Sequence, residues 1–199
     1  MKMKLIIKYC IFWVVCSCLS SCLKDSQDTV LLPLPVGTIY GVDLPEGLTD
    51  HIKVHDGIDP PSLEGSFWAT PMEVEYASDG YWNGEYYDLY IAFTAMDSRN
   101  VTSYREKQNS SSGVSSKARV IGSGNNFTAY TEVEMQDPKE DWWCKVLTII
   151  TGTVEGNGIE DFQYANVMLE KRDPYNKLME VGEYHILHDK DNHVVNYEW

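Results

Sequence analysis

The feature that most constrains this fold is an alternation of side-chain character with a period of two residues. Between residues 127 and 135, one predicted face carries Phe127, Ala129, Thr131, Val133 and Met135, and the other carries Thr128, Tyr130, Glu132 and Glu134. Successive side chains of a β-strand point to opposite faces, so this pattern predicts a strand with one buried face and one solvated face. The same alternation places together Met72, Val74 and Tyr76, and further along Tyr87, Leu89, Ile91 and Phe93.

Later segments predict strands joined by tight turns. Residues 145–154 are β-branched and apolar on both faces, which favours a central strand. The Asn157-Gly158 pair that follows is typical of a hairpin turn, with a return strand at 159–170. A last pair of strands, at 184–188 and 194–199, brackets a predicted hairpin turn at 189–192.

The whole pattern predicts an all-β fold. About nine or ten strands in series, joined by short turns, form an antiparallel meander. Such a meander buries its apolar faces by closing as a lipocalin-like barrel or as a two-sheet β-sandwich. Both remain open, although hairpin links between neighbouring strands favour the barrel. We expect no helix longer than a turn or two.

One stretch interrupts the alternation. Residues 97–125 contain two clusters of serine and glycine, so we expect a mobile loop here. The stretch is also basic, and its cationic residues are Arg99, Arg105, Lys107, Lys117 and Arg119.

The N-terminal residues have the layout of an export signal. Three lysines precede an apolar run from Tyr9 to Val15, which is shorter than the roughly 20 residues of a membrane-spanning helix. The run leads into Leu19-Ser20-Ser21-Cys22, which resembles the lipobox of bacterial lipoproteins. The resemblance implies that residues 1–21 are a signal peptide that is removed and that Cys22 is acylated. We expect residues 22–36 to be a lipid anchor and tether, and residues 37–199 to be a single all-β domain.

Two short motifs in the tether also resemble signals of exported bacterial proteins. Lys24-Asp25 resembles a surface-export signal, and Asp28-Thr29-Val30 resembles the O-glycosylation motif of Bacteroidota, with Thr29 as the acceptor. The whole chain resembles envelope lipoproteins of Bacteroidota with one all-β domain. This resemblance implies a lipid-anchored protein of the cell envelope, in the outer membrane, facing the periplasm or the cell surface. No catalytic residues carry over from it.

Charge and cysteine content narrow the class of partner. The chain has a net charge of −14, and loss of the three signal lysines leaves 13 basic against 30 acidic residues, or −17. Nucleic acid is therefore not an expected partner, because phosphate binding needs a basic surface. The acyl chains on Cys22, rather than charge, would hold the protein at the membrane. Cys144 is the lone cysteine of the predicted domain, and we expect a buried structural thiol.

Candidate catalytic and metal-binding groups are few. Glu73 with Glu75, and Glu132 with Glu134, each share a predicted face, and two such pairs facing each other could cleave a glycosidic bond. The polar outer face of a sheet explains the same pattern. His185, His188 and His193 lie near aspartates, but we expect solvated hairpin residues rather than a metal site. We therefore predict no enzyme activity, no cofactor and no metal.

Aromatic residues in turns are the strongest binding signal. Tyr81 and Trp82 lie within a turn-rich stretch at 78–84, and Trp142 and Trp143 follow another at 137–141. Aromatic rings on loops stack on sugars or anchor a partner protein, and they also fold back to cap a core.

Three functions remain open. The leading hypothesis is a non-enzymatic binding or assembly module for a glycan or an envelope protein, anchored through Cys22. The alternative is a lipocalin-like carrier, in which the barrel mouth holds a small apolar ligand. The third is a hydrolase that uses the paired glutamates. The sequence leaves the ligand, the membrane face and the oligomeric state open.

Overall fold

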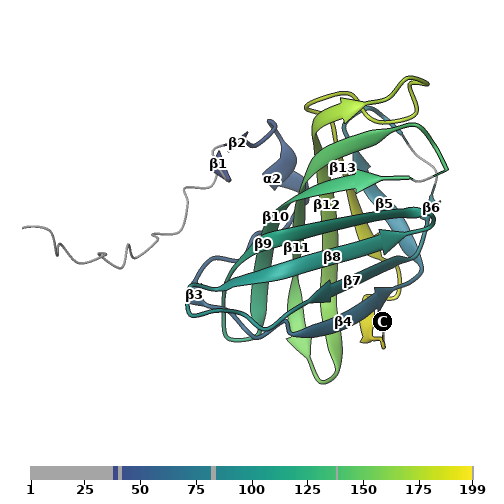
Figure 1. Ribbon diagram of the computed structural model, residues 1–199. Coiled ribbons are helices and arrows are strands. Elements are labelled where there is room, and N and C mark those ends of the chain that lie inside the picture. The colour runs from purple at the N-terminus through teal and green to yellow at the C-terminus, as the bar shows by residue number, and fades with distance from the viewer. Residues whose placement is uncertain (1–37, 40–41, 82–83, 138, 199) are drawn as a thin grey trace, which may run out of the picture. The chain divides into compact units, whose positions relative to one another are not determined.

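Residues 38–39, 42–81, 84–137 and 139–198 are described by a computed structural model, in which β-strands dominate (Figure 1). The first part of the chain supplies β1 (Thr38–Ile39), β2 (Val42–Asp43), the one-turn helix α2 (Leu48–His51), β3 (Ile58–Asp59), β4 (Gly65–Ala69), β5 (Met72–Ala77), β6 (Glu85–Tyr86) and β7 (Leu89–Phe93). The longer strands follow, as β8 (Val101–Gln108), β9 (Ser111–Ser123), β10 (Asn126–Gln136), β11 (Trp143–Glu155) and β12 (Gly158–Arg172), and then β13 (Tyr184–Asp189) and β14 (His193–Asn196). The prediction of an all-β fold is confirmed.

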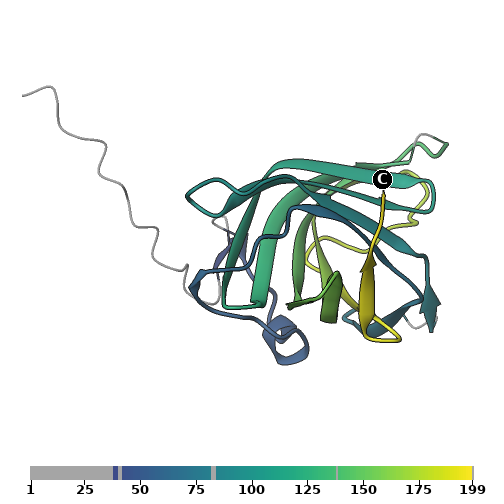
Figure 2. The same ribbon diagram turned by 90° about the horizontal axis from the view of Figure 1, so that it is seen from below.

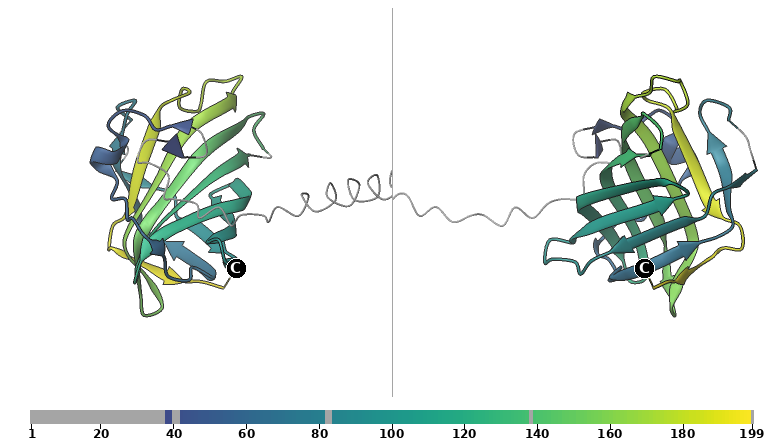
Figure 3. Two further views of the ribbon diagram at one scale, coloured as in Figure 1. Left: turned by 90° about the vertical axis from the view of Figure 1, so that its left-hand side faces the viewer. Right: turned by 45° about the vertical axis from the view of Figure 1, so that its right-hand side comes forward.

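Eight of these strands form a closed ring. The hydrogen-bonded order runs β11, β10, β9, β8, β7, β4, β14, β12, and β12 pairs again with β11. Every pairing in the ring is antiparallel. Strands β7–β9 cross steeply over β11 and β12, and the right-hand view of Figure 3 shows the same crossing. The predicted antiparallel meander therefore closes as a barrel, which leaves no free sheet edge around the ring.

Three neighbouring strands of the barrel break at the same level. Strands β13 and β14 both pair antiparallel with β12, so they run in the same direction and are two halves of one strand. By the same argument β5 continues β4, and β6 continues β7. The predicted turn at residues 189–192 is present, since the Asn192 N–H donates to the Asp189 carbonyl at 3.1 Å. The two strands that it joins do not pair as a hairpin, because they are halves of one strand.

Hydrogen bonds hold the three breaks together. The Thr70 backbone N–H donates to Asp189 Oδ2 at 2.8 Å, and the Thr70 hydroxyl donates to Asp88 Oδ1 at 2.5 Å. The carboxylates of Asp88 and Asp189 thus accept hydrogen bonds from the hydroxyl and the backbone N–H of Thr70, at the point where regular strand pairing is interrupted.

Irregularities also shift the phase of two predicted strands. A bulge where β5 pairs with β13 skips Glu75, so Tyr76 lies on the outer face, while Met72 and Val74 lie in the barrel interior. Between β6 and β7 the phase changes again: Tyr86 packs against the interior core, whereas Tyr87 is 61% exposed. The predictions that Tyr76 and Tyr87 share the buried faces were therefore wrong.

The stretch at 97–125 forms regular structure rather than a mobile loop. Strands β8 and β9 pair as a long hairpin, in which only Asn109 and Ser110 separate them. The serines and glycines that suggested a loop belong to β9 or to the turns that flank it. The prediction of a flexible basic loop was wrong, because antiparallel pairing on both edges of β9 outweighs its low strand propensity.

The barrel interior is a dense apolar core. As predicted, Phe127, Ala129, Val133 and Met135 of β10 face this core, which is joined by residues from every strand of the ring. Its largest members with almost no exposure include Tyr164, Phe127, Phe162, Leu89, Ile91 and Ile150. Burial of this apolar surface is the main term that stabilises the barrel.

A second core lies on the outside of the barrel. The segment after β2, here called the arm (residues 44–59), packs Leu48 and Ile52 against Tyr130, Ile149 and residues beside them on β10–β13. Figure 2 shows α2, the blue coil, outside the ring on the side away from the teal strands. The apolar outer face of β11, predicted from residues 145–154, is therefore covered by the arm.

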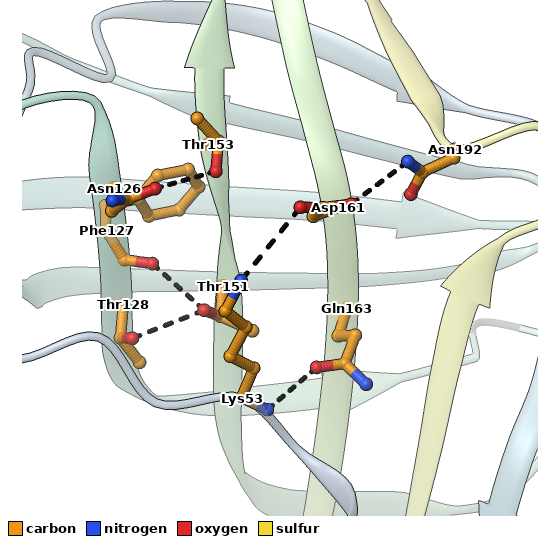
Figure 4. Close-up of polar contacts among 9 residues, drawn as sticks. All are labelled: Lys53, Asn126, Phe127, Thr128, Thr151, Thr153, Asp161, Gln163 and Asn192. Carbon is orange, nitrogen blue, oxygen red and sulfur yellow. Dashed lines mark hydrogen bonds and ion pairs between the residues drawn. The ribbon is translucent and has the colours of Figure 1, made fainter.

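Polar contacts fasten the arm across the strands (Figure 4). The Lys53 backbone N–H donates to Gln163 Oε1 at 2.8 Å, and Lys53 Nζ lies 4.0 Å from Asp161 Oδ2. Beyond Lys53 the arm reaches β9, where β3 pairs in parallel with Gly122 and Ser123. Gly57 permits this approach, because a Cβ there would lie 2.1 Å from the Gly122 carbonyl oxygen.

Both cores are self-contained. Their members all lie between residues 44 and 194, and Pro33–Trp199 form one compact unit. We therefore expect residues 33–199 to fold on their own, and we use this part of the chain for the binding and stability tests below.

Candidate functional site

One end of the barrel carries a pocket, here called the end pocket, of about 520 Å³. It lies where the β5–β6 loop, the β8–β9 turn, the β10–β11 loop and the β12–β13 loop meet. Its wall includes residues of these loops and interior side chains of the strands: Asp79, Tyr81, Tyr86, Gln108, Met135, Asp137, Trp142, Cys144, Val146, Asn166, Met168, Lys177, Leu178, Met179, Glu180, Glu183 and His185 among them. The pocket therefore connects the rim to the inside of the barrel.

The rim is braced by side-chain contacts between loops. Ser110 of the β8–β9 turn donates a hydrogen bond to Asp137 of the β10–β11 loop. Lys177 of the β12–β13 loop pairs with Glu140 of the β10–β11 loop. The Ser110 hydroxyl and the Lys139 backbone N–H together hold the pKa of Asp137 below its usual range. These links join three of the four loops.

The fourth loop, between β5 and β6, contacts β13 through an aromatic stack. The Tyr81 ring stacks on the His185 ring, with centroids 5.5 Å apart, and His185 Nε2 lies 3.0 Å from Asp79 Oδ1. Desolvation opposes the charge on Asp79, but hydrogen bonds from the Tyr81 backbone and from His185 outweigh it and lower the pKa of this carboxyl. Tyr81 is thus held at the rim.

The floor of the end pocket is mainly apolar. Trp142 packs against the interior core, and Cys144, Val146 and Met168 lie beyond it. Burial, with the nearby charge of Glu106, raises the pKa of the Cys144 thiol to about 12. The thiol therefore stays protonated at neutral pH, as expected for a structural cysteine rather than a nucleophile.

A chain of buried polar groups lies next to this floor. The hydroxyls of Tyr104 and Tyr164 donate to Glu106 Oε2 at 2.6 and 2.9 Å. Asn166 Nδ2 donates to the Tyr164 hydroxyl at 2.8 Å, and the Thr148 hydroxyl donates to Asn166 Oδ1 at 2.8 Å. Every donor in this chain is directed toward Glu106, whose other oxygen, Oε1, has no hydrogen-bond partner among the described residues.

The structure separates the aromatic residues that the sequence singled out. Tyr81 and Trp142 both line the end pocket. Trp143, which is 39% exposed, instead lines a separate depression between β9 and β10. Trp82 lies outside the described residues, as do the acylation candidate Cys22 and the glycosylation candidate Thr29.

The glutamate pairs do not meet. Glu73 and Glu75 are on β5, and Glu132 and Glu134 are on β10, with β11, β12 and β13 between them in the sheet. Glu73 pairs with Lys190 at 2.6 Å, and Glu134 approaches Lys145 at 4.0 Å. These contacts are those of carboxylates on the outer face of a sheet.

The histidines are also apart. His185 contacts Asp79, whereas His193 Nδ1 lies 2.6 Å from Glu160 Oε1. Within the part of the chain that the structure describes, no group of three or more His, Cys, Asp or Glu residues is arranged to hold a metal ion.

Sequence reasoning missed the polar chain around Glu106. Glu106 lies in the stretch at 97–125, which was predicted to be a mobile basic loop. The signal was present in Thr102, Tyr104, Glu106 and Gln108, which alternate with Ser103, Arg105 and Lys107. The period of two is regular there, but the inward residues are polar, so the pattern did not resemble a strand with an apolar face.

A larger groove of about 1000 Å³ runs beside β7, β8 and β9. Its lining includes Ala92, Phe93, Thr94, Tyr104, Arg105 and Val114. It lacks the convergent loops of the end pocket, so the end pocket is the stronger candidate site.

Among the described residues, no helix is long and apolar enough to cross a membrane. Comparison with protein-family models, with curated proteins and with solved structures found no match to this chain.

Proposed function

We propose that this protein is a lipid-anchored lipoprotein of the cell envelope whose barrel binds a small, largely apolar ligand in the end pocket. The observation that carries the proposal is the joining of Tyr81 and Trp142 in one pocket that continues into an apolar interior. A volume of about 520 Å³ suits a small molecule. The proposed activity is binding, without covalent chemistry, a cofactor or a nucleic-acid partner.

The arrangement of the aromatic residues favours a carrier over a flat binding surface. A platform for a glycan or a partner protein would present its rings together on one face. Here Trp142 is turned into the end pocket and Trp143 lies in a different depression. The aromatic turns that suggested a surface module therefore support the lipocalin-like carrier more strongly.

A binding or assembly module remains a second candidate. Trp143 is 39% exposed on a strand that begins at the rim, and it would be available to a glycan or to an envelope protein. This function would depend on Trp143, whereas the carrier function would depend on Trp142.

The neighbouring tryptophans provide a matched test of the carrier. We expect residues 33–199 to bind Nile red, a neutral apolar dye, with an increase in its fluorescence. Trp142→Ala should weaken binding by about tenfold, because a buried aromatic contact contributes on the order of 1–2 kcal/mol. Trp143→Ala, which changes the adjacent residue outside the pocket, should bind as the parent does.

Two results would count against the carrier. Absence of dye binding to a protein with a cooperative unfolding transition would exclude an open pocket. Equal loss of affinity in both variants would indicate that the dye adheres to the rim surface rather than entering the barrel.

The membrane anchor has its own test. In cells supplied with an alkyne-bearing fatty acid, the full chain should incorporate label, and Cys22→Ala should not, because the acyl chains are attached through its thiol and amine. Cys144→Ala serves as the cysteine control and should keep the label. Persistent labelling of Cys22→Ala would contradict the proposed anchor.

A further inference from the structure

The buried carboxyl group of Glu106 lies just beneath the end pocket. On β8 it is one inward position below Gln108, which lines the pocket. Its neighbour in the polar chain, Asn166, also lines the pocket and reaches Glu106 through the Tyr164 hydroxyl. Glu106 is 1% exposed, so its carboxyl group is away from solvent.

The two oxygens of this carboxyl group differ in their surroundings. Oε2 accepts hydrogen bonds from Tyr104 and Tyr164, while Oε1 has no partner among the described residues. A buried carboxylate oxygen without a donor is costly, and native structures rarely leave one unexplained. Since the hydrogen bonds from Tyr104 and Tyr164 both go to Oε2, a donor to the ionised Oε1 would come from a ligand or a water.

Three side chains surround the glycine beside Oε1. On β9, Gly113 faces the interior next to Glu106, and a Cβ at this position would lie 2.3 Å from Val133 Cγ1, 3.2 Å from Oε1 and 3.2 Å from Met135 Cγ. The Val133 methyl group therefore already occupies the space above Gly113, and a ligand has to displace a neighbouring side chain to reach Oε1. Met135 lines the end pocket, so its side chain lies between the pocket and the carboxyl group. A methionine is unbranched and adaptable, so a ligand entering from the pocket can displace it.

Charge at the rim favours a cationic donor. Asp79, Asp137, Glu180 and Glu183 line the end pocket, against a single lysine, Lys177. Lys177 is paired with Glu140, and Glu180 is paired with Lys171, which is not part of the pocket wall. A mouth lined by one sign of charge attracts ligands of the opposite sign. The acidic rim and the buried carboxyl group of Glu106 therefore both favour a positively charged ligand.

We propose that the end pocket binds an amphipathic amine, with its apolar body against Trp142 and Met168 and its ammonium group donating to Glu106 Oε1. This inference rests on the proposed carrier function and names the chemical class of its ligand. Burial raises the pKa of Glu106, with the two tyrosine hydroxyls acting in the opposite direction, and an ammonium partner would offset that cost by favouring the ionised form. Glu106 would thus select the ligand by charge, while the aromatic and aliphatic walls supply most of the contact area.

Three probes of nearly the same size separate charge from apolar contact. We would measure displacement of Nile red from residues 33–199 by 2-phenylethylamine, by neutral propylbenzene and by anionic 3-phenylpropanoate. The amine should bind at least tenfold more tightly than propylbenzene, and the anion should bind most weakly. This comparison uses the unaltered protein and does not depend on any variant folding.

Two variants assign the preference to Glu106. In Glu106→Gln the amide oxygen still accepts from the tyrosines, but the group carries no charge, so the preference for the amine should fall to less than threefold, with propylbenzene unchanged. Glu134→Gln removes an exposed carboxylate on the outer face and should keep the full preference. Nile red binding and the unfolding midpoint report whether each variant is folded.

The outcomes distinguish the two proposals. If neither the dye nor any probe binds, the carrier function fails, and the amine site fails with it. If propylbenzene binds as tightly as the amine, the carrier function stands, and the inference about Glu106 is overturned. A full amine preference in Glu106→Gln would show that the rim alone selects and that Oε1 holds only a buried water.

Discussion

At the scale of residues, the buried carboxyl group of Asp189 lies where a strand of the barrel is interrupted. Asp189 is 1% exposed and accepts hydrogen bonds from the backbone N–H groups of Thr70 and His193. Burial, together with the adjacent Asp191 carboxylate, raises the pKa of Asp189 to about 7. The hydrogen bond between the two carboxyl groups lowers the pKa of Asp191, so the pair holds one shared proton in mildly acidic solution.

This pair predicts a pH-dependent stability with a defined sign. Asp189 binds its proton more tightly in the folded chain than in the unfolded chain, so its contribution is fully present below about pH 4 and is lost as the pH rises through about 7. Between pH 5 and pH 8 the free energy of unfolding should therefore decrease by about 2–3 kcal/mol through this pair. Asp191→Asn removes the like charge and should reduce the decrease, as measured by urea unfolding of residues 33–199.

Asp141→Asn is the control for this experiment. Asp141 forms an exposed ion pair with Arg172, far along the chain from the break, and its loss should leave the pH slope of the parent unchanged. Equal slopes in the parent and in Asp191→Asn would rule out a shared proton.

At the scale of elements, the arm is the segment that packs on the outside of the barrel ring. It contributes no strand to the barrel ring, yet Leu48 has no exposed surface, and Ile52 is 3% exposed. Its polar contacts reach strands that are more than 70 residues away in sequence, as in the His55 backbone N–H that donates to the Thr128 hydroxyl at 2.8 Å. The arm therefore acts as a structural cover for the apolar outer face of β10–β13.

This role predicts a large energetic effect for a residue outside the barrel. Leu48→Ala should lower the free energy of unfolding by about 2–5 kcal/mol, the usual cost of truncating a fully buried leucine. Ile58→Ala is the control on the same arm, because Ile58 is 75% exposed and should change stability by less than about 0.5 kcal/mol. Equal, small effects of both substitutions on urea unfolding would mean that the arm detaches from the barrel at little cost.

At the scale of the whole molecule, the barrel is asymmetric. Strands β10, β11 and β12 have the interior core on one face and the arm core on the other. The outer face of β7 instead carries a small aromatic cluster of Trp68, Tyr90 and Tyr197, which is not part of either core. The two walls of one barrel should therefore differ in local stability, although they share the same interior.

Amide hydrogen exchange measures this difference directly. In residues 33–199 we expect the slowest exchange at the centres of β10, β11 and β12, where Ile149 and Ala165 are covered on the outside as well. Amides of β7 and β8 should exchange at least tenfold faster. Leu48→Ala should narrow this gap by exposing the outer face, and uniform protection around the ring would contradict the two-layer description.

The candidate site could be predicted from the sequence only in part. Tyr81 and Trp142 were recognised as loop aromatics, but nothing in their spacing indicated that they share a pocket from which Trp143 is excluded. The contact of Glu106 with Tyr164 joins residues 58 positions apart, and it arises only because the closed ring turns both side chains inward. A polar inward row on β8 was interpreted as loop, because apolar character is the signal by which a buried face is recognised.

The sequence by itself determined that β5, β7 and β10–β14 are strands and, for β10 and β11, which side chains are buried, whereas β8 and β9 were predicted as loop. That is possible because an extended backbone alternates its side chains strictly, so a local pattern is enough. Only the tertiary structure decided the phase after the irregularities at Glu75 and Tyr87, the joining of β13 with β14 into one strand, and the closure of the ring. These features depend on pairing between strands that are distant in the sequence. Every residue type other than proline offers the same backbone hydrogen-bonding groups, so the choice of partner strand leaves little signal in the amino-acid sequence.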